Sequence, residues 1–414
     1  MSPGQVTCVS SAAANKWDSV RFLAVFNTSA GFRFRAWFAS HLLAANTGRL
    51  TACDSVVWVG PGKEDPMSNI STDSAPMPES RDKSFLAPRR MALAVMWVVT
   101  TAAIVVMLFY NVRSTGQYKE VRYVLQVGYV AALLWYLGRS GPSVNQLPEI
   151  RPQVLSRWKF GAWIPVLVIA LLFALTFVSE QGAPSLMLLM MVATGPILMA
   201  WRREIGRRSV IQGITVALIA FLAGSQMSYN GFISKPVLYL LPVFSFPMYV
   251  AGGLLYERTR LGGIQLLTGQ YGKAAKSVLG GGLLFVPLGL LNAAGGSTGP
   301  GITWVTKWWQ PFWLPWFSGI AEEAWWRLFL VGLCFFFLRP AFRTRPALAV
   351  IASALFSGIT FGMLHGFTLE RFLVTGLLYG VPMAAMFARR DWEHAVGAHY
   401  MVNMIPWVLV FLKI

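Results

Sequence analysis

The feature that most constrains this chain is a series of apolar segments, each about as long as a bilayer is thick. A helix needs about 20 consecutive apolar residues to cross the hydrocarbon core. Such segments recur from residue 91 onward, at 91–110, 122–138, 160–178, 185–201, 209–226, 236–256, 276–292, 318–338, 347–366, 370–388 and 395–412. Because a helix satisfies its own backbone hydrogen bonds, we expect an all-α fold, a polytopic transmembrane helix bundle of about 10–11 spans.

Composition supports this prediction. Hydrophobic residues make up 55% of the 414 residues and charged residues only 13%, whereas soluble domains carry about 25% charged residues. The net charge is +18, most of it in short runs between the apolar segments from residue 91 onward. Such runs are typical of cytoplasmic loops, so we expect membrane lipid with anionic headgroups as a partner, and no nucleic acid.

The connections between the apolar segments alternate in charge. Arg-rich connections, such as those at Arg202 and Arg339, alternate with poorly charged ones, such as the stretch 292–318. This alternation predicts successive spans with the Arg-rich connections in the cytoplasm. The connection at Arg113, Lys119 and Arg122 breaks the pattern.

We divide the chain into three parts. Residues 1–90 are interpreted as a disordered N-terminal extension or an early start codon, with a transit-peptide-like segment as the alternative. We expect residues 91–274 to form N-terminal transmembrane helices and residues 275–412 to form a second transmembrane core. In that core the triplet Gly280–Gly282 predicts close helix packing, and the Trp-rich stretch 304–316 predicts an interfacial belt or, alternatively, a substrate-entry lip.

Two adjacent carboxylates, Glu322 and Glu323, lie within an apolar segment. Ionisable groups at the centre of a span cost about 2.5–3.5 kcal/mol each, so they indicate a partner or a function. Glu323 and Arg327 are four residues apart and can pair on one helix face. Glu322 then points elsewhere and is free to meet another helix. A purely structural ion-pair cluster explains this motif equally well.

Three of the four histidines lie in the last 50 residues. His365 follows Phe361 by four residues, and Asn403 follows His399 by four, so each pair shares a helix face. We interpret His394 as a packed or interfacial residue, since its side chain points roughly 140° away from that of His399.

These residues form three motifs in order, Glu322-Glu323-Ala-Trp-Trp-Arg327, Phe361-Gly-Met-Leu-His365 and His399-Tyr-Met-Val-Asn403. The set resembles the CAAX-protease and bacteriocin-processing family of intramembrane proteases, over roughly residues 275–412. The resemblance implies an endopeptidase in which Glu322 is the general base and His365 positions the water. His399 and Asn403 can donate hydrogen bonds to an oxyanion. Glu323 and Arg327 would organise the site, and Phe361 would hold His365.

The resemblance leaves several alternatives open. It favours a mechanism without cofactor or metal, although Glu322, His365 and His399 could together bind zinc. The substrate could be a prenylated CAAX protein, a bacteriocin or signal-peptide precursor, or another membrane protein. The resemblance also implies an integral, multi-pass location, with a bacterial cell membrane expected. A catalytically silent member acting in self-immunity or as a scaffold, and a proton-coupled transporter, are the competing functions.

The expected topology places the two histidines apart. Alternation puts His365 at the end of its span away from the Arg clusters, whereas His399 lies only about 12 Å inside the other face if its helix begins near Asp391. Catalysis needs these residues together, so we expect tilted or broken helices and a water-filled cavity that reaches the middle of the membrane.

Overall fold

The computed structural model describes residues 83–109, 119–140, 163–179, 181–229, 235–295 and 305–412. These residues belong to one compact unit, Pro78–Ile414. Residues 1–82, and with them most of the expected N-terminal extension, lie outside the described residues, as do Arg113 and Trp304.

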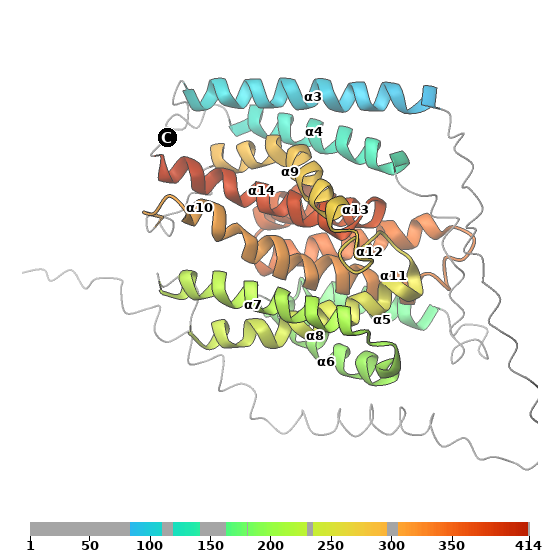
Figure 1. The fold of residues 1–414 in the computed structure, drawn as a ribbon. Coiled ribbons are helices and arrows are strands. Elements are labelled where there is room, and N and C mark those ends of the chain that lie inside the picture. Colours follow the sequence, from blue (N-terminus) through green and yellow to red (C-terminus); the bar gives the residue numbers. More distant parts are fainter. Residues whose placement is uncertain are drawn as a thin grey trace, which may run out of the picture. The chain divides into compact units, whose positions relative to one another are not determined.

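The described part of the chain is helical, with no strand (Figure 1), so the all-α prediction is confirmed. The helices are α3 Lys83–Phe109, α4 Lys119–Ser140, α5 Ile164–Leu175, α6 Gly182–Ala200, η6 Arg202–Glu204, α7 Arg207–Tyr229, α8 Lys235–Thr259, α9 Tyr271–Ala294, α10 Gln310–Trp313, η8 Phe317–Glu322, η9 Ala324–Val331, α11 Gly332–Leu338, α12 Pro346–Leu364, η10 Arg371–Gly380, α13 Val381–Arg389 and α14 Trp392–Phe411.

Six helical segments within these ranges are long and apolar enough to cross a membrane: Ala87–Leu108, Glu120–Gly138, Arg207–Met227, Tyr271–Ala294, Pro346–Leu364 and Arg371–Arg389. Two shorter apolar helices, Ile164–Leu175 and Pro184–Ala200, accompany them. The chain is therefore a multi-pass membrane protein by length and composition. The expected spans 236–256, 318–338 and 395–412 correspond to α8, to the broken helix η8–η9–α11, and to α14.

Helices α9 and α14 run in parallel and approach closely through glycine. A Cβ atom added at Gly281 would lie 2.0 Å from the carbonyl oxygen of His394, and one added at Gly397 would lie 1.9 Å from that of Val278. Only glycine allows this backbone contact, which is typical of membrane helix pairs. The glycine triplet thus serves close packing, as its composition predicts.

The start of α14 is recessed within the bundle. The side chain of Asp391, the residue that caps α14, accepts a hydrogen bond from Ser277 Oγ at 2.9 Å. Ser277 lies six residues into α9, which corresponds to about 9 Å along the helix axis. His399 therefore lies about 20 Å from the first turn of α9 rather than about 12 Å, because its own helix starts deeper than the neighbouring span.

The basic residues are concentrated at one end of the helix bundle. Contacts such as those of Arg389 with the Leu137 and Gly138 carbonyl oxygens bring the end of α13 to the end of α4. One end of the bundle, the arginine-rich end, carries most of the basic residues of the described helices and their connections: Arg89, Arg90, Arg139, Arg202, Arg203, Arg207, Arg208, Arg258, Arg260, Lys273, Lys276, Arg339, Arg343, Arg345, Arg389 and Arg390. The opposite end carries Lys119, Arg122, Lys235, Lys307 and Arg371.

Arg122 has a local partner at this opposite end. Its guanidinium lies against Gly295, where a Cβ atom would approach Arg122 Nη1 to 2.1 Å, and over the ring of Tyr123 at 4.8 Å. Gly295 caps the C-terminus of α9, and the helix dipole makes a C-terminus favourable for a cation. This contact explains why a basic residue interrupts the charge alternation near the second span.

We predict that Gly281→Ala destabilises the protein, whereas Gly272→Ala does not. Both residues lie in α9, but no atom lies within 4 Å of a Cβ at Gly272. Alanine in a helix is ordinarily favoured over glycine by roughly 0.5–1 kcal/mol, whereas overpacking costs about 1–3 kcal/mol. Thermal unfolding in detergent should show a lower midpoint for the first variant alone. Equal midpoints for the two variants would contradict the backbone contact.

Candidate active site

The structure brings the six predicted site residues together from three separate helical segments. Glu322, Glu323 and Arg327 lie where η8 passes into η9, and His365 caps the C-terminus of α12. His399 and Asn403 lie one turn apart on α14. Because α14 starts at a recessed position, His399 and Asn403 lie at the same level as the other four residues. His365 and His399 are therefore close together, although the loop pattern predicts that they lie apart.

Phe361 forms the centre of this group. Its ring contacts the rings of His365 and His399, with centroids 4.5 Å and 5.5 Å away. The guanidinium carbon of Arg327 lies 4.7 Å from the same ring centroid. The face of an aromatic ring is electrostatically negative, so it attracts a cation or the positive edge of another ring. Phe361 therefore holds members of all three motifs, beyond the packing of His365 that the sequence indicates.

The helix around Glu323 has wide turns. Residues Phe317–Glu322 and Ala324–Val331 are both π-helical, with Glu323 between them. Such turns are rare and occur frequently at functional sites. The two carboxylates therefore sit on a locally unwound part of the helix, which ordinary 3.6-residue spacing does not anticipate.

Glu323 joins two helices by its two oxygens. Its Oε1 lies 2.7 Å from His399 Nδ1, and its Oε2 lies 3.4 Å from Arg327 Nε. Both carboxylate and guanidinium are fully buried, and the imidazole is 4% exposed. A carboxylate accepts only, so His399 Nδ1 carries the proton in this bond. The expected pair of Glu323 with Arg327 is thus one half of a three-residue bridge.

Glu322 faces the same imidazole from the other side. Its Oε2 lies 3.7 Å from His399 Nε2, and its side chain is 16% exposed. Among the described residues this oxygen has no hydrogen-bond partner. Of the two carboxylates, Glu322 is therefore the one with the longer contact to His399 and the greater exposure.

His365 has a defined tautomer. Its Nδ1 lies 2.9 Å from the carbonyl oxygen of Phe361. A carbonyl only accepts, so Nδ1 carries the hydrogen and the neutral ring presents the lone pair of Nε2. The ring can accordingly accept a hydrogen bond from a water molecule.

Two serines that the sequence motifs do not include hold site residues in place. Asn403 Nδ2 donates to Ser318 Oγ at 2.6 Å, and Ser318 Oγ donates to the Pro315 carbonyl oxygen at 3.1 Å. Ser357 Oγ lies 3.5 Å from Arg327 Nη1 and donates to the Trp326 carbonyl oxygen. Ser318 precedes Glu322 by four residues, and this spacing could have indicated it.

His394 takes no part in this group. Its Nδ1 and its backbone N–H both contact Asp391 Oδ1, at 2.7 Å and 2.8 Å. Burial raises the pKa of Asp391, but the hydrogen bonds from His394 and Ser277 outweigh it and bring the pKa below its ordinary value. His394 therefore helps to cap α14 just before the expected span, as a packed residue.

The described residues contain no preformed ligand set for a metal ion. No three His, Cys, Asp or Glu side chains there converge as they would around a metal ion. Of the residues named for zinc, His365 and His399 each contact a partner through Nδ1: the Phe361 carbonyl oxygen and Glu323, respectively.

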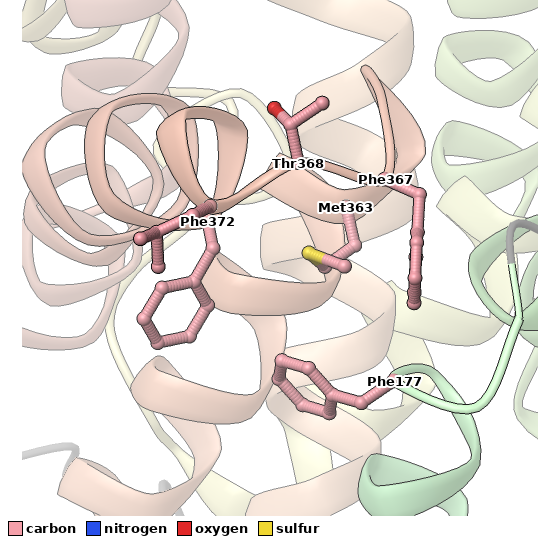
Figure 2. Close-up of a pocket in the computed structure, with 6 residues that line it drawn as sticks. Phe177, Met363, Phe367, Thr368 and Phe372 are labelled. Carbon is pink, nitrogen blue, oxygen red and sulfur yellow. The ribbon is translucent and has the colours of Figure 1, made fainter.

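A separate apolar groove of about 320 Å³ lies at the opposite end of the bundle (Figure 2), lined by Phe177, Met363, Phe367, Thr368, Leu369 and Phe372. Met363 precedes His365 by two residues and so faces roughly 160° away from it around α12. The groove presents no titratable side chain and is distinct from the candidate site.

Comparison with known proteins gives no relative: no family model, curated protein or solved structure matches this chain. The function is therefore inferred from the residues and their geometry.

We predict that Glu323→Ala lowers stability far more than Glu322→Ala. Removing Glu323 leaves the buried Arg327 charge without its counter-ion, and breaking such a pair costs about 3–5 kcal/mol. Glu322 is partly exposed, and its Oε2 has no hydrogen-bond partner among the described residues. Denaturant unfolding of both variants measures the difference. Similar losses for the two variants would show that Glu323 is not the structural member of the pair.

Proposed function

We propose that this protein is an intramembrane endopeptidase of the CAAX-protease and bacteriocin-processing type. The observation that supports the proposal is that the His365 and His399 rings meet at the ring of Phe361, while Glu322 Oε2 lies 3.7 Å from His399 Nε2. Three motifs from distant parts of the chain supply them. A structural ion-pair cluster needs only Glu323 and Arg327, and it does not account for a second carboxylate that approaches the same imidazole.

In the proposed reaction Glu322 accepts a proton from a water molecule whose other hydrogen bond goes to His365 Nε2. The hydroxide formed attacks the carbonyl carbon of the scissile peptide bond, and the carbonyl oxygen becomes an oxyanion. Glu322 then passes the proton to the leaving amine as the C–N bond breaks. The products are a carboxylic acid and an amine, and the enzyme is regenerated.

The oxyanion needs a hydrogen-bond donor aimed at it. His399 Nδ1 donates to Glu323, so the ring would donate to the oxyanion through Nε2 only in its imidazolium form. Asn403 donates one amide hydrogen to Ser318 and retains a second. Glu323 and Arg327 keep the His399 ring oriented, in the way that a carboxylate orients the histidine of a hydrolytic triad.

The proposed substrate is a membrane-associated peptide or protein, and the proposed location is a bacterial cell membrane. The prenylated CAAX terminus, the bacteriocin or signal-peptide precursor and the membrane protein are all compatible with the motifs.

The test compares protein termini and released peptides from cells that express wild type or Glu322→Gln at matched levels. This change keeps the shape of the side chain and removes the base. Termini found only with the wild type would support proteolysis and identify the substrate. Identical termini across growth conditions would contradict it and favour a scaffold or immunity role. Glu257→Gln, in an exposed ion pair with Arg260, is the matched control and should cleave as wild type does.

We also predict that chelators leave cleavage unchanged. The proposed base is a carboxylate, so no metal-bound water is required. Purified protein, treated with a strong chelator and then dialysed, should cleave the identified substrate at the wild-type rate. A loss of activity that zinc restores would instead support the alternative with Glu322, His365 and His399 as ligands.

A further inference from the structure

Exposure changes systematically across the candidate site. Glu323 and Arg327 are fully buried and His399 is 4% exposed. The Glu322 side chain is 16% exposed, and His365 is an exposed residue. The side chains that the proposed function makes reactive are therefore less buried than the residues that orient them.

The exposed side of the site faces the end of the bundle opposite the arginine-rich end. His365 lies at that end of α12 and is followed by exposed residues, including Leu369 at 72%. On α14, buried residues give way beyond His399 to half-buried ones such as Asn403. The pair of Asn403 with Ser318 lies near the start of η8, again toward this end.

The arginine-rich side of the site is closed by packing. Every residue from Ala324 to Val331 is buried. The connection between α8 and α9 is hydrogen-bonded to the start of α14. Trp392 N donates to the Gly263 carbonyl oxygen at 2.8 Å, and Leu266 N donates to Glu393 Oε1 at 2.7 Å. Within the described residues, the site is thus covered on this side and more open on the other.

Aromatic side chains mark the membrane boundary near the open side. Trp308 is 70% exposed and Phe312 is 48% exposed, just before η8. Tyr400, one residue after His399, donates to the Phe312 carbonyl oxygen at 3.0 Å. Exposed aromatic residues gather at the level of the lipid headgroups. The opening therefore lies near the interface rather than in the hydrocarbon centre.

The charge of the two ends determines which interface this is. Basic residues crowd the arginine-rich end, and short connections rich in Lys and Arg stay in the cytoplasm. We propose that the candidate site opens to the non-cytoplasmic face of the membrane. The substrate class follows from this orientation and rests on the proposed function. It is an exported peptide precursor, or a membrane protein cut just outside the bilayer. A lipidated C-terminus presented from the cytoplasm is excluded.

Cysteine labelling in intact cells tests the orientation. In a chain with Cys8, Cys53 and Cys334 replaced by alanine, Leu369→Cys reports on the open side. Thr344→Cys is its matched control, exposed in the turn between α11 and α12 at the arginine-rich end. A membrane-impermeant maleimide should label Leu369→Cys in intact cells and Thr344→Cys only after permeabilisation. The reverse pattern would overturn the proposal.

Access to the site itself is tested by Glu322→Cys with a small, charged methanethiosulfonate reagent. We expect modification from outside intact cells, and none for Ala324→Cys, which is fully buried. Modification of Glu322→Cys only after permeabilisation would overturn the outward opening.

Comparison of protein termini separates this proposal from the proposed function. Glu322-dependent cleavage together with cytoplasmic labelling would keep the protease and reject the outward opening. Outward labelling without any cleavage would keep the opening and reject the substrate class. Cleaved termini on exported or extracytoplasmic segments would support both.

Discussion

The structure depends on one buried carboxylate. Glu323 binds His399 on α14 by one oxygen and Arg327 by the other, and none of the three is more than 4% exposed. Each charge would be costly alone in an apolar bundle. Together they offset that cost and fix the orientation of the imidazole. This bridge leaves Glu322, the adjacent carboxylate, on the less buried side, with its Oε2 3.7 Å from His399 Nε2. Glu323 thus organises the cluster, and the proposed function assigns the reaction to Glu322.

Helix packing determines whether the bridge can form. The backbones of α9 and α14 touch at Gly281 and Gly397, and the contact of Asp391 with Ser277 sets how deep α14 begins. That depth carries His399 to the level of Phe361, near the far end of α12. The site thus depends on helix contacts that lie between about 3 Å and 12 Å from His399 along α14. The same arrangement leaves His365 exposed and His399 buried.

The apolar segments suffice to predict the helical bundle, and the Arg-rich connections suffice to predict which helix ends lie together. Residue spacing also predicts that Glu323 pairs with Arg327. The depth of His399 could not be predicted, because a loop pattern does not show that one helix starts about 9 Å inside its neighbour. The roles of Ser318 and Ser357 were missed for a related reason: small hydroxyl residues are common in membrane helices, and only their contacts across helices distinguish them. The π-helical turns beside Glu323 likewise depend on packing and not on local propensity.

The coupling energy between Glu323 and His399 is the most direct test of whether this bond organises the site. A double-mutant cycle of Glu323→Gln and His399→Gln, measured by denaturant unfolding, isolates it. If the bond forms as described, the double variant is less destabilised than the sum of the single variants, by roughly 0.5–3 kcal/mol. Glu323→Gln combined with His394→Gln should instead be additive, since His394 bonds only within its own helix cap. Additive effects for Glu323 and His399 would contradict the bridge and, with it, the assignment of roles to the two carboxylates.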